Sequence, residues 1–234
     1  MAIVLAAEGS DITASGMDHA RSLVALDDTA FDLYRMLQSS RGTGLMCFDY
    51  HLHANALNPT CTVVLHGEPG AGKSALLRNI LASYVLPKDC CGHCLPSVFI
   101  DADHCFDVSG IAKLLKVKAE RSSGSSDVVS EMVSESLSRV LVLRPREPVD
   151  LLRQLRKLRD VFASNPTAGL LIIDSMSAWQ HQTNAFPRSS GTALKECWRA
   201  IARLQQESSV AAIVSHRDAE WTGNMGSMGN MGNM

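Results

Sequence analysis

Short apolar runs alternate along the chain with longer stretches in which apolar residues recur every three or four positions. The runs consist mostly of Val, Ile and Leu, and they cover residues 61–66, 97–101, 139–143, 169–174 and 209–215. Continuous apolar runs of this length are typical of strands that helices cover on both faces. Their alternation with helical segments predicts an α/β domain with a mostly parallel sheet flanked by helices.

The segments between these runs have the spacing of amphipathic helices, predicted over about 74–86, 108–120, 127–137, 151–162 and 189–207. Pro87 ends the first helix, and Asp127 is placed to cap the third. The helix over 151–162 has an apolar face and a basic face, the latter with Arg153, Arg156, Lys157 and Arg159. This basic face is either solvated surface or a contact for a phosphate backbone or an acidic partner.

Changes in composition predict three parts of the chain. Residues 1–28 are expected to be a flexible N-terminal lead-in, and residues 29–217 a folded domain that starts with a short helix at 29–37 and a loop at 39–44. Residues 218–234 are expected to be a disordered Gly/Met-rich tail, because their Gly-x-Met triplets have neither a strand period nor a helix period.

The overall composition limits the classes of function. The 234 residues are 46% hydrophobic and 20% charged, with a formal net charge of −2, so the chain is not expected to coat nucleic acid by itself. Any DNA contact should be local or shared with a partner. We expect no membrane partner, because no apolar run could cross a bilayer and the first residues lack the positive region of a secretory signal. Seven cysteines without such a signal suggest reduced thiols.

One stretch carries a specific motif. Residues 67–74 match G-x-x-x-x-G-K-[ST], the phosphate-binding loop of nucleotide-binding proteins, between a predicted strand and a predicted helix. Its glycines let backbone N–H groups turn towards phosphate oxygens, and the helix N-terminus adds further donors. The alternative is an ordinary glycine-rich turn. The predicted nucleotide-binding residues are Gly67, Glu68, Pro69, Gly70, Ala71, Gly72, Lys73 and Ser74.

Two residues of this loop and two carboxylates have separate predicted tasks. Lys73 would reach the β- and γ-phosphates of ATP, and the Ser74 hydroxyl would hold Mg²⁺. Asp174, at the end of the run 169–174, would hold the same Mg²⁺ through water; the alternative is a buried strand that merely ends in Asp. Ser175 follows it, so no Glu is available there as a base. The candidate catalytic residue is therefore Asp103, which would orient or deprotonate a water, or else be a turn residue at a strand end.

A cysteine-rich stretch follows the first helix. Cys90, Cys91, His93 and Cys94 are metal-ligand residue types, but a zinc site usually needs two ligand pairs at suitable spacing, and this first pair is crowded. A surface loop with reduced thiols is favoured, and a zinc site is the alternative.

Three motifs together resemble the RecA-like recombinases of eukaryotes, and more closely their DNA-repair paralogues. They are the phosphate loop, the run Phe99-Ile100-Asp101-Ala102-Asp103-His104-Cys105-Phe106-Asp107, and the run Leu170-Leu171-Ile172-Ile173-Asp174-Ser175. The resemblance extends over about residues 31–215. It implies a P-loop NTPase with a RecA-like core that is C-terminally truncated relative to the family, because the family continues through further strands.

The resemblance also implies a function. It suggests an ATP- and Mg²⁺-binding subunit of a heteromeric complex with other recombinase paralogues, which acts in the nucleus in homologous-recombination repair of double-strand breaks. DNA would be contacted through the complex. Asp103 matches the family's catalytic Glu, and the side chain shorter by one methylene implies weak or absent ATP hydrolysis.

Other family positions are less clear. A loop over 176–191 matches the first DNA-binding loop, where Arg188 is the candidate DNA contact and an exposed linker is the alternative. His216 and Arg217 match a polar pair that reads the γ-phosphate, and neither is assigned that task. Two other functions stay open: a freestanding P-loop kinase or NTPase acting on a small molecule, and an interaction module in which nucleotide only stabilises the fold.

Overall fold

A computed structural model describes residues 2–7, 42–43, 45, 57, 61–122, 125–164, 169–179, 190–208 and 210–217. The strands are β1 (Ala2–Ala7), β2 (Cys61–His66), β3 (Ser97–Asp101), β4 (Val140–Leu143), β5 (Leu170–Asp174) and β6 (Ala211–His216). The helices are α4 (Lys73–Val85), the short 3-10 turn η1 (Lys88–Cys90), α5 (Val108–Glu120), α6 (Ser126–Ser138), α7 (Pro148–Ser164) and α9 (Ser190–Ser208).

The predicted parallel sheet is confirmed. Its strand order is β1-β2-β6-β5-β3-β4, and the five strands from β2 to β4 in this order are all parallel. Each begins and ends within two residues of its apolar run. The sixth strand, β1, pairs antiparallel with β2 at the edge of the sheet, a strand that the sequence analysis did not predict. The predicted boundaries between the lead-in, the domain and the tail stay predictions.

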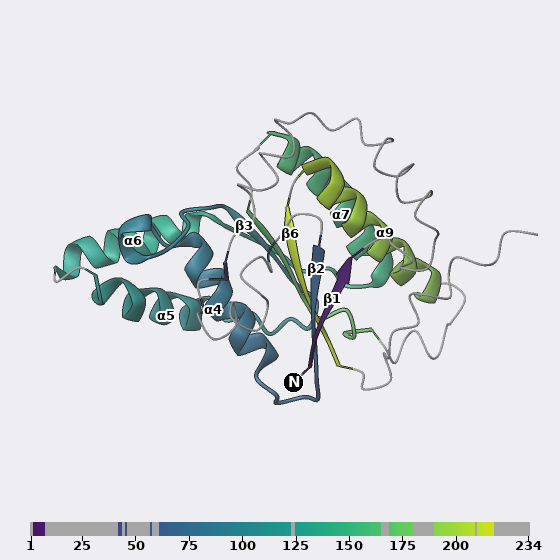
Figure 1. The fold of residues 1–234 in the computed structure, drawn as a ribbon, viewed down its shortest axis with the longest axis horizontal. Helices are drawn as coiled ribbons and strands as arrows, with labels where there is room; N and C mark the ends of the chain where they lie inside the picture. Colours follow the sequence, from purple (N-terminus) through teal and green to yellow (C-terminus); the bar gives the residue numbers. More distant parts are fainter. Residues whose placement is uncertain are drawn as a thin grey trace, which may run out of the picture.

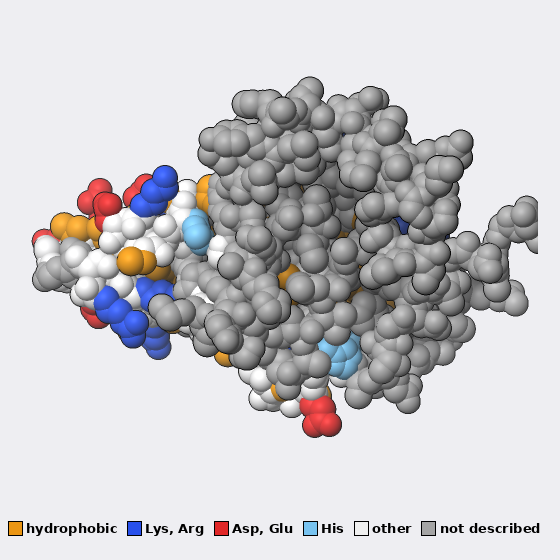
Figure 2. Space-filling model, in the orientation of Figure 1, with side chains coloured by type: hydrophobic (Ala, Val, Ile, Leu, Met, Phe, Trp, Pro, Cys, Tyr) orange, Lys and Arg blue, Asp and Glu red, His pale blue; other side chains and the backbone are white. Residues whose placement is uncertain are grey.

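Helices cover both faces of the sheet, which explains why its strands are apolar throughout (Figure 1). Along β5, Leu170 and Ile172 belong to the core beneath α4, α5 and α6, whereas Leu171 and Ile173 belong to the core beneath α7 and α9. The α5–α6 hairpin extends beyond the sheet, and Figure 2 shows charged side chains along its surface. Among the described helices, none combines the length and the apolarity that a bilayer crossing would need.

The loop after α4 folds back and satisfies the carbonyl groups at the end of this helix. The backbone N–H groups of His93 and Leu95 donate to Ser83 and Tyr84, and the Arg139 side chain donates to the Val85 carbonyl. Gly92 lies so close to Leu86 that an added Cβ would be 2.1 Å from its carbonyl oxygen, so a larger residue does not fit. These contacts fix the C-terminal end of α4, whose N-terminal end carries the phosphate loop.

One prediction about helix capping is wrong, and three others fall on residues that the structure does not describe. Asp127 does not cap α6: the cap residue is Ser125, and Asp127 lies in the first helical turn, where its charge is still favourable to the helix dipole. The predicted helix over 29–37, Arg188 and the tail over 218–234 lie outside the described residues.

Candidate nucleotide-binding site

The loop over residues 67–74 joins β2 to α4, in the strand and helix context that the motif requires. Gly70 and Gly72 have φ angles of 82° and 85°. An added Cβ at either position would have no atom within 4 Å, so the left-handed backbone, and not lack of space, favours glycine here. Gly72 is the N-cap of α4 and has no side chain to bond the first amides of the helix. This end of α4 is therefore suited to an anion.

Lys73 is held over the loop. Its Nζ atom donates to the carbonyl oxygens of Gly67 at 2.6 Å and Glu68 at 2.9 Å, and the residue is only 8% exposed. Burial lowers the pKa of Lys73, and the positive charge of Arg217 lowers it further, while Asp174 and Asp103 raise it. The amino group of Lys73 therefore lies within electrostatic reach of all three side chains.

Asp174 lies on the same face and at the same edge of the sheet as the phosphate loop. It ends β5, which is separated from β2 by β6 alone, and alternation along β5 directs it to the face that α4 covers. Strand spacing places it about 10 Å from β2 across the sheet. It is 7% exposed, and its Oδ1 atom accepts a hydrogen bond from Ser215 Oγ on β6.

Asp103 follows β3 and faces the end of β5. Its Oδ2 atom accepts a hydrogen bond from Ser175 Oγ at 3.1 Å and forms an ion pair with Arg217 Nη2 at 2.6 Å. The backbone N–H groups of Ala102 and Asp103 donate to the carbonyl oxygen of Asp174, which fixes the start of this loop against β5. The structure thus brings Asp103 to the carboxyl ends of β5 and β6, beside the predicted metal ligand.

The partners of these carboxylates were not predicted from the sequence. Ser215 and Ser175 bond to Asp174 and Asp103, and both occupy strand ends that the apolar runs had already indicated. The pair His216 and Arg217 divides between the two faces: Arg217 contacts Asp103, whereas alternation along β6 directs His216 to the face beneath α7 and α9. There its ring lies 5.8 Å from that of His66.

The predicted roles of these residues remain predictions. Ser74 is exposed at the start of α4, and its pairing with Asp174 through Mg²⁺ is a proposal taken up below. The residues present nevertheless fit such a group, because an exposed hydroxyl, a buried carboxylate and an uncapped helix N-terminus all lie at the carboxyl edge of the sheet.

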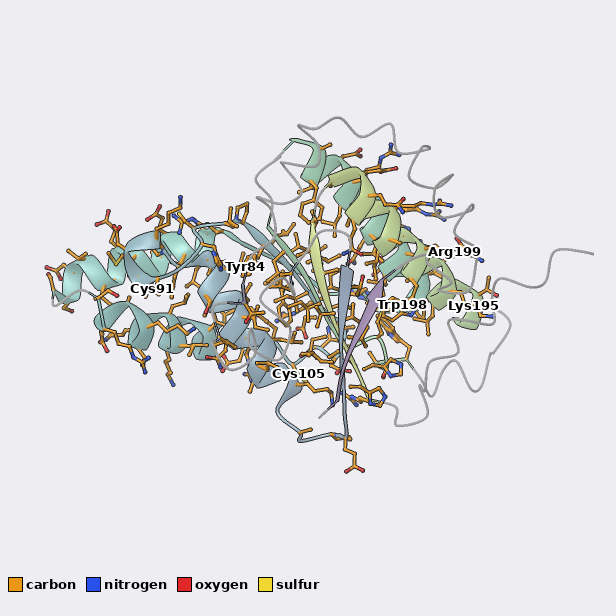
Figure 3. All side chains as sticks on the ribbon, in the orientation of Figure 1. Tyr84, Cys91, Cys105, Lys195, Trp198 and Arg199 are labelled. Carbon is orange, nitrogen blue, oxygen red and sulfur yellow. The ribbon has the colours of Figure 1, made fainter. Side chains whose placement is uncertain are left out.

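The basic face of α7 is partly neutralised within the fold. Arg153 pairs with Asp150 at 3.3 Å, and Arg159 pairs with Glu207 of α9 at 2.8 Å. A cavity of about 330 Å³ lies between the two helices, beside Arg156 and Arg203. Lys195, Trp198 and Arg199 lie closer than Arg203 to the N-terminal end of α9 (Figure 3). Both interpretations of this face, solvated surface and partner contact, stay open.

The cysteine-rich loop lies near the end of α4 that is remote from the phosphate loop, where Cys91 is labelled in Figure 3. Cys91 is exposed, while Cys90 is buried with its sulfur 3.7 Å from that of Met132. The His93 ring packs against the Tyr84 ring at an interplanar angle of 60°, and its Nε2 atom lies 3.0 Å from the Gly42 carbonyl oxygen. Within the described ranges, no group of three or more His, Cys, Asp or Glu side chains is arranged to hold a metal ion.

Thiol labelling is expected to distinguish the exposed cysteines from the buried Cys197. Iodoacetamide at about pH 8 should modify the exposed Cys91 and Cys105 in the folded chain and leave Cys197 unmodified. Burial raises the pKa of Cys197 to about 12, so roughly one part in ten thousand is thiolate at that pH. Peptide mass spectrometry measures this, with a sample in concentrated urea as the control. Labelling of Cys197 in the folded chain as fast as Cys91 would contradict the packing of α9 described above.

The chain is similar to a curated DNA repair protein. No family model matches the chain. The chain is 33% identical over 150 residues to DNA repair protein XRCC2 of Mus musculus, an alignment that covers 61% of this chain and 50% of the mouse protein. The chain therefore spans about half of the length of this curated relative.

The motifs point to the same relative. Five short runs resemble X-ray repair cross-complementing protein two: Leu65-His66-Gly67, Leu86-Pro87-Lys88, Phe99-Ile100-Asp101, His104-Cys105-Phe106-Asp107 and Asp174-Ser175-Met176-Ser177-Ala178. The first, third and fifth lie at the carboxyl ends of β2, β3 and β5. The similarity to a DNA repair protein supports, over the aligned part of the chain, the resemblance to the DNA-repair paralogues of the recombinases.

Proposed function

We propose that this chain is an ATP-binding recombinase paralogue that acts in homologous-recombination repair of DNA double-strand breaks as a subunit of a heteromeric paralogue complex. The observation that carries the proposal is the meeting of Lys73, Asp174 and Asp103 at one edge of a parallel α/β sheet, in a chain similar to a DNA repair protein. Neither the site geometry nor the similarity suffices alone, because phosphate loops occur in many families and the similarity covers only part of the chain.

ATP with Mg²⁺ is the ligand that this edge suits best. Lys73 and the uncapped amides of α4 supply positive charge for the phosphates, and Gly70 and Gly72 allow the close backbone approach. Ser74 and Asp174 would hold Mg²⁺, the latter through water, and the ion would neutralise charge on the β- and γ-phosphates. The hydrogen bond from Ser215 orients the Asp174 carboxylate for this task.

Little or no hydrolysis is part of the proposal. A general base must be free to accept a proton from the attacking water. The Asp103 side chain is one methylene shorter than the Glu of recombinases, so an attacking water placed for that Glu would lie too far from its carboxylate. The chain is therefore proposed to use ATP as a bound structural ligand in its complex.

The other subunits of the proposed complex would supply the contacts to DNA. The net charge of −2 favours DNA contact through partner subunits, and the nucleus is the compartment that a repair role implies. The alternative, a freestanding kinase or NTPase acting on a small molecule, needs a cationic lid over the acceptor. Among the described residues, Arg144 and Arg159 already pair with Asp101 and Glu207, which favours the paralogue role.

Co-purification tests the proposal. The tagged full chain, with and without ATP and Mg²⁺, is expected to retain at least one other recombinase paralogue of the same organism from a mixture of purified candidates. The Lys73→Ala variant is the control for the nucleotide dependence of that contact. A chain that binds no paralogue and phosphorylates a metabolite would contradict the proposed function and favour the kinase alternative.

A further inference from the structure

Two histidines lie side by side on neighbouring strands at the carboxyl edge of the sheet. His66 ends β2, His216 ends β6, and the two residues are directly paired in the register of these parallel strands (Figure 1). Alternation along each strand directs both side chains to the face beneath α7 and α9, because Thr62 of β2 donates to Gln205 of α9 and Val214 of β6 belongs to that core. The pair therefore lies on the face of the sheet opposite to α4.

The separation of the two rings is that of two ligands on one metal ion. Their centroids lie 5.8 Å apart, and their planes are inclined by 31°. A Zn–N bond of about 2.0–2.1 Å places an imidazole centroid about 3.2 Å from the ion. Two imidazoles on one ion then have centroids about 5.2 Å apart at a tetrahedral angle and about 6.4 Å apart in a straight line. The strands thus already hold the rings at the spacing that one shared ion requires.

One ring nitrogen of this pair lacks a partner. His66 is 9% exposed, and its Nε2 atom is buried with no hydrogen-bond partner among the described residues. A buried polar atom without a partner destabilises a fold, so its presence needs an explanation, and an ion bound at the site is one. Imidazole nitrogen is also the commonest protein ligand of transition metals. The unpaired nitrogen and the ring spacing are independent observations that indicate the same kind of ligand.

We propose that His66 and His216 bind one divalent transition-metal ion of the Zn²⁺ class, which joins the ends of β2 and β6. Imidazole ligands select such an ion over Mg²⁺, which prefers oxygen. Among the residues that the structure describes, no carboxylate or thiol joins the two rings in a metal-binding group, so water completes the coordination.

The position of the ion gives it a structural consequence. Gly67 directly follows His66, so the ion would fix the strand end from which the phosphate loop starts. The site is separate from the one proposed for Mg²⁺ at Ser74 and Asp174, because Asp174 lies on the other face of the sheet. The inference therefore does not depend on nucleotide binding.

Titration calorimetry of the full chain with ZnCl₂, in a buffer without chelators, tests the site. Exposed thiols also bind Zn²⁺, so every variant carries Cys91→Ser and Cys105→Ser. His66→Gln and His216→Gln are each expected to weaken the binding of one ion per chain by at least about tenfold. Loss of a group that merely supports a ligand already weakens metal affinity about 10- to 100-fold, and these two residues are the ligands themselves.

His104→Gln is the matched control, because His104 is an exposed histidine at the same edge of the sheet and its loss should leave the zinc affinity unchanged. X-ray absorption at the zinc edge, with one equivalent bound, should show two imidazole nitrogens at about 2.0–2.1 Å in the chain with both histidines and one in either variant. Thermal melting without metal verifies folding.

Two outcomes would overturn the proposal: unchanged zinc affinity in His66→Gln or His216→Gln, or a zinc spectrum without two imidazoles in the chain that keeps both histidines. The spectrum needs no variant, so it decides the question even if a substitution prevents folding. Either outcome leaves the proposed nucleotide site untouched. Failure of the chain to bind ATP would, in turn, leave the zinc site standing.

Discussion

Replacement of Lys73 by alanine is expected to abolish the stabilisation of this chain by ATP and Mg²⁺. In the unsubstituted chain, a nucleotide at a hundredfold excess over Kd adds about 2.7 kcal/mol to the free energy of unfolding. For a domain of this size that gain raises Tm by roughly 5–10 °C. Lys73 supplies the ammonium group for the β- and γ-phosphates, and alanine leaves these charges without that partner. Differential scanning fluorimetry with and without nucleotide measures the shift.

Lys118 offers a matched control for this experiment. As for Lys73, burial lowers the pKa of Lys118. The Nζ atom of Lys118 donates to Ser83 Oγ of α4 at 2.8 Å. Lys118→Ala should lower the Tm without nucleotide, because Ser83 Oγ and the Asn79 carbonyl oxygen lose a donor, and should keep the full response to ATP. If Lys73→Ala keeps the ATP response as well, the loop over residues 67–74 is not the nucleotide site.

Most of the fold follows from the apolar runs, and the reason is physical. Each strand of the parallel sheet is buried on both faces, so its sequence is apolar from end to end and its limits are sharp: residues 61–66 and 97–101 were predicted without error. The β1 strand was missed although Ala2–Ala7 is an apolar run like the others, because the composition of residues 1–28 as a whole predicted a flexible lead-in.

Only those site residues that belong to the phosphate-loop motif or follow an apolar run could be predicted from the sequence. The phosphate loop has a fixed spacing, and the carboxylates Asp174 and Asp103 each follow an apolar run. The partner of Asp103 could not be predicted in the same way. Arg217 lies 114 positions away in the sequence and reaches Asp103 only because a single strand, β5, lies between β3 and β6 in the sheet. Contacts of this kind depend on strand order, which periodicity does not contain.

Asp101 illustrates a residue whose task the sequence did not reveal. It ends β3 and is 2% exposed. Its Oδ1 atom accepts the backbone N–H of Cys105 at 2.8 Å, and its Oδ2 atom accepts the N–H of Phe106 at 3.1 Å and Nε of Arg144 at 3.0 Å. One buried carboxylate thereby fixes the loop between β3 and α5, which carries Asp103.

Asp101→Ala is accordingly expected to lower the free energy of unfolding by about 3 kcal/mol, because two amide groups and a guanidinium lose their acceptor. Urea denaturation followed by circular dichroism measures this change as a lower midpoint at an unchanged slope. Arg144→Gln separates the charge from the hydrogen bonds, because the amide groups keep the Asp101 carboxylate. Arg144 is half-exposed, so the expected loss in the free energy of unfolding is below about 1 kcal/mol. Similar stabilities for Asp101→Ala and the unsubstituted chain would mean that water replaces the carboxylate, and that packing of Phe106 on Phe99, with ring centroids 4.6 Å apart, holds the loop instead.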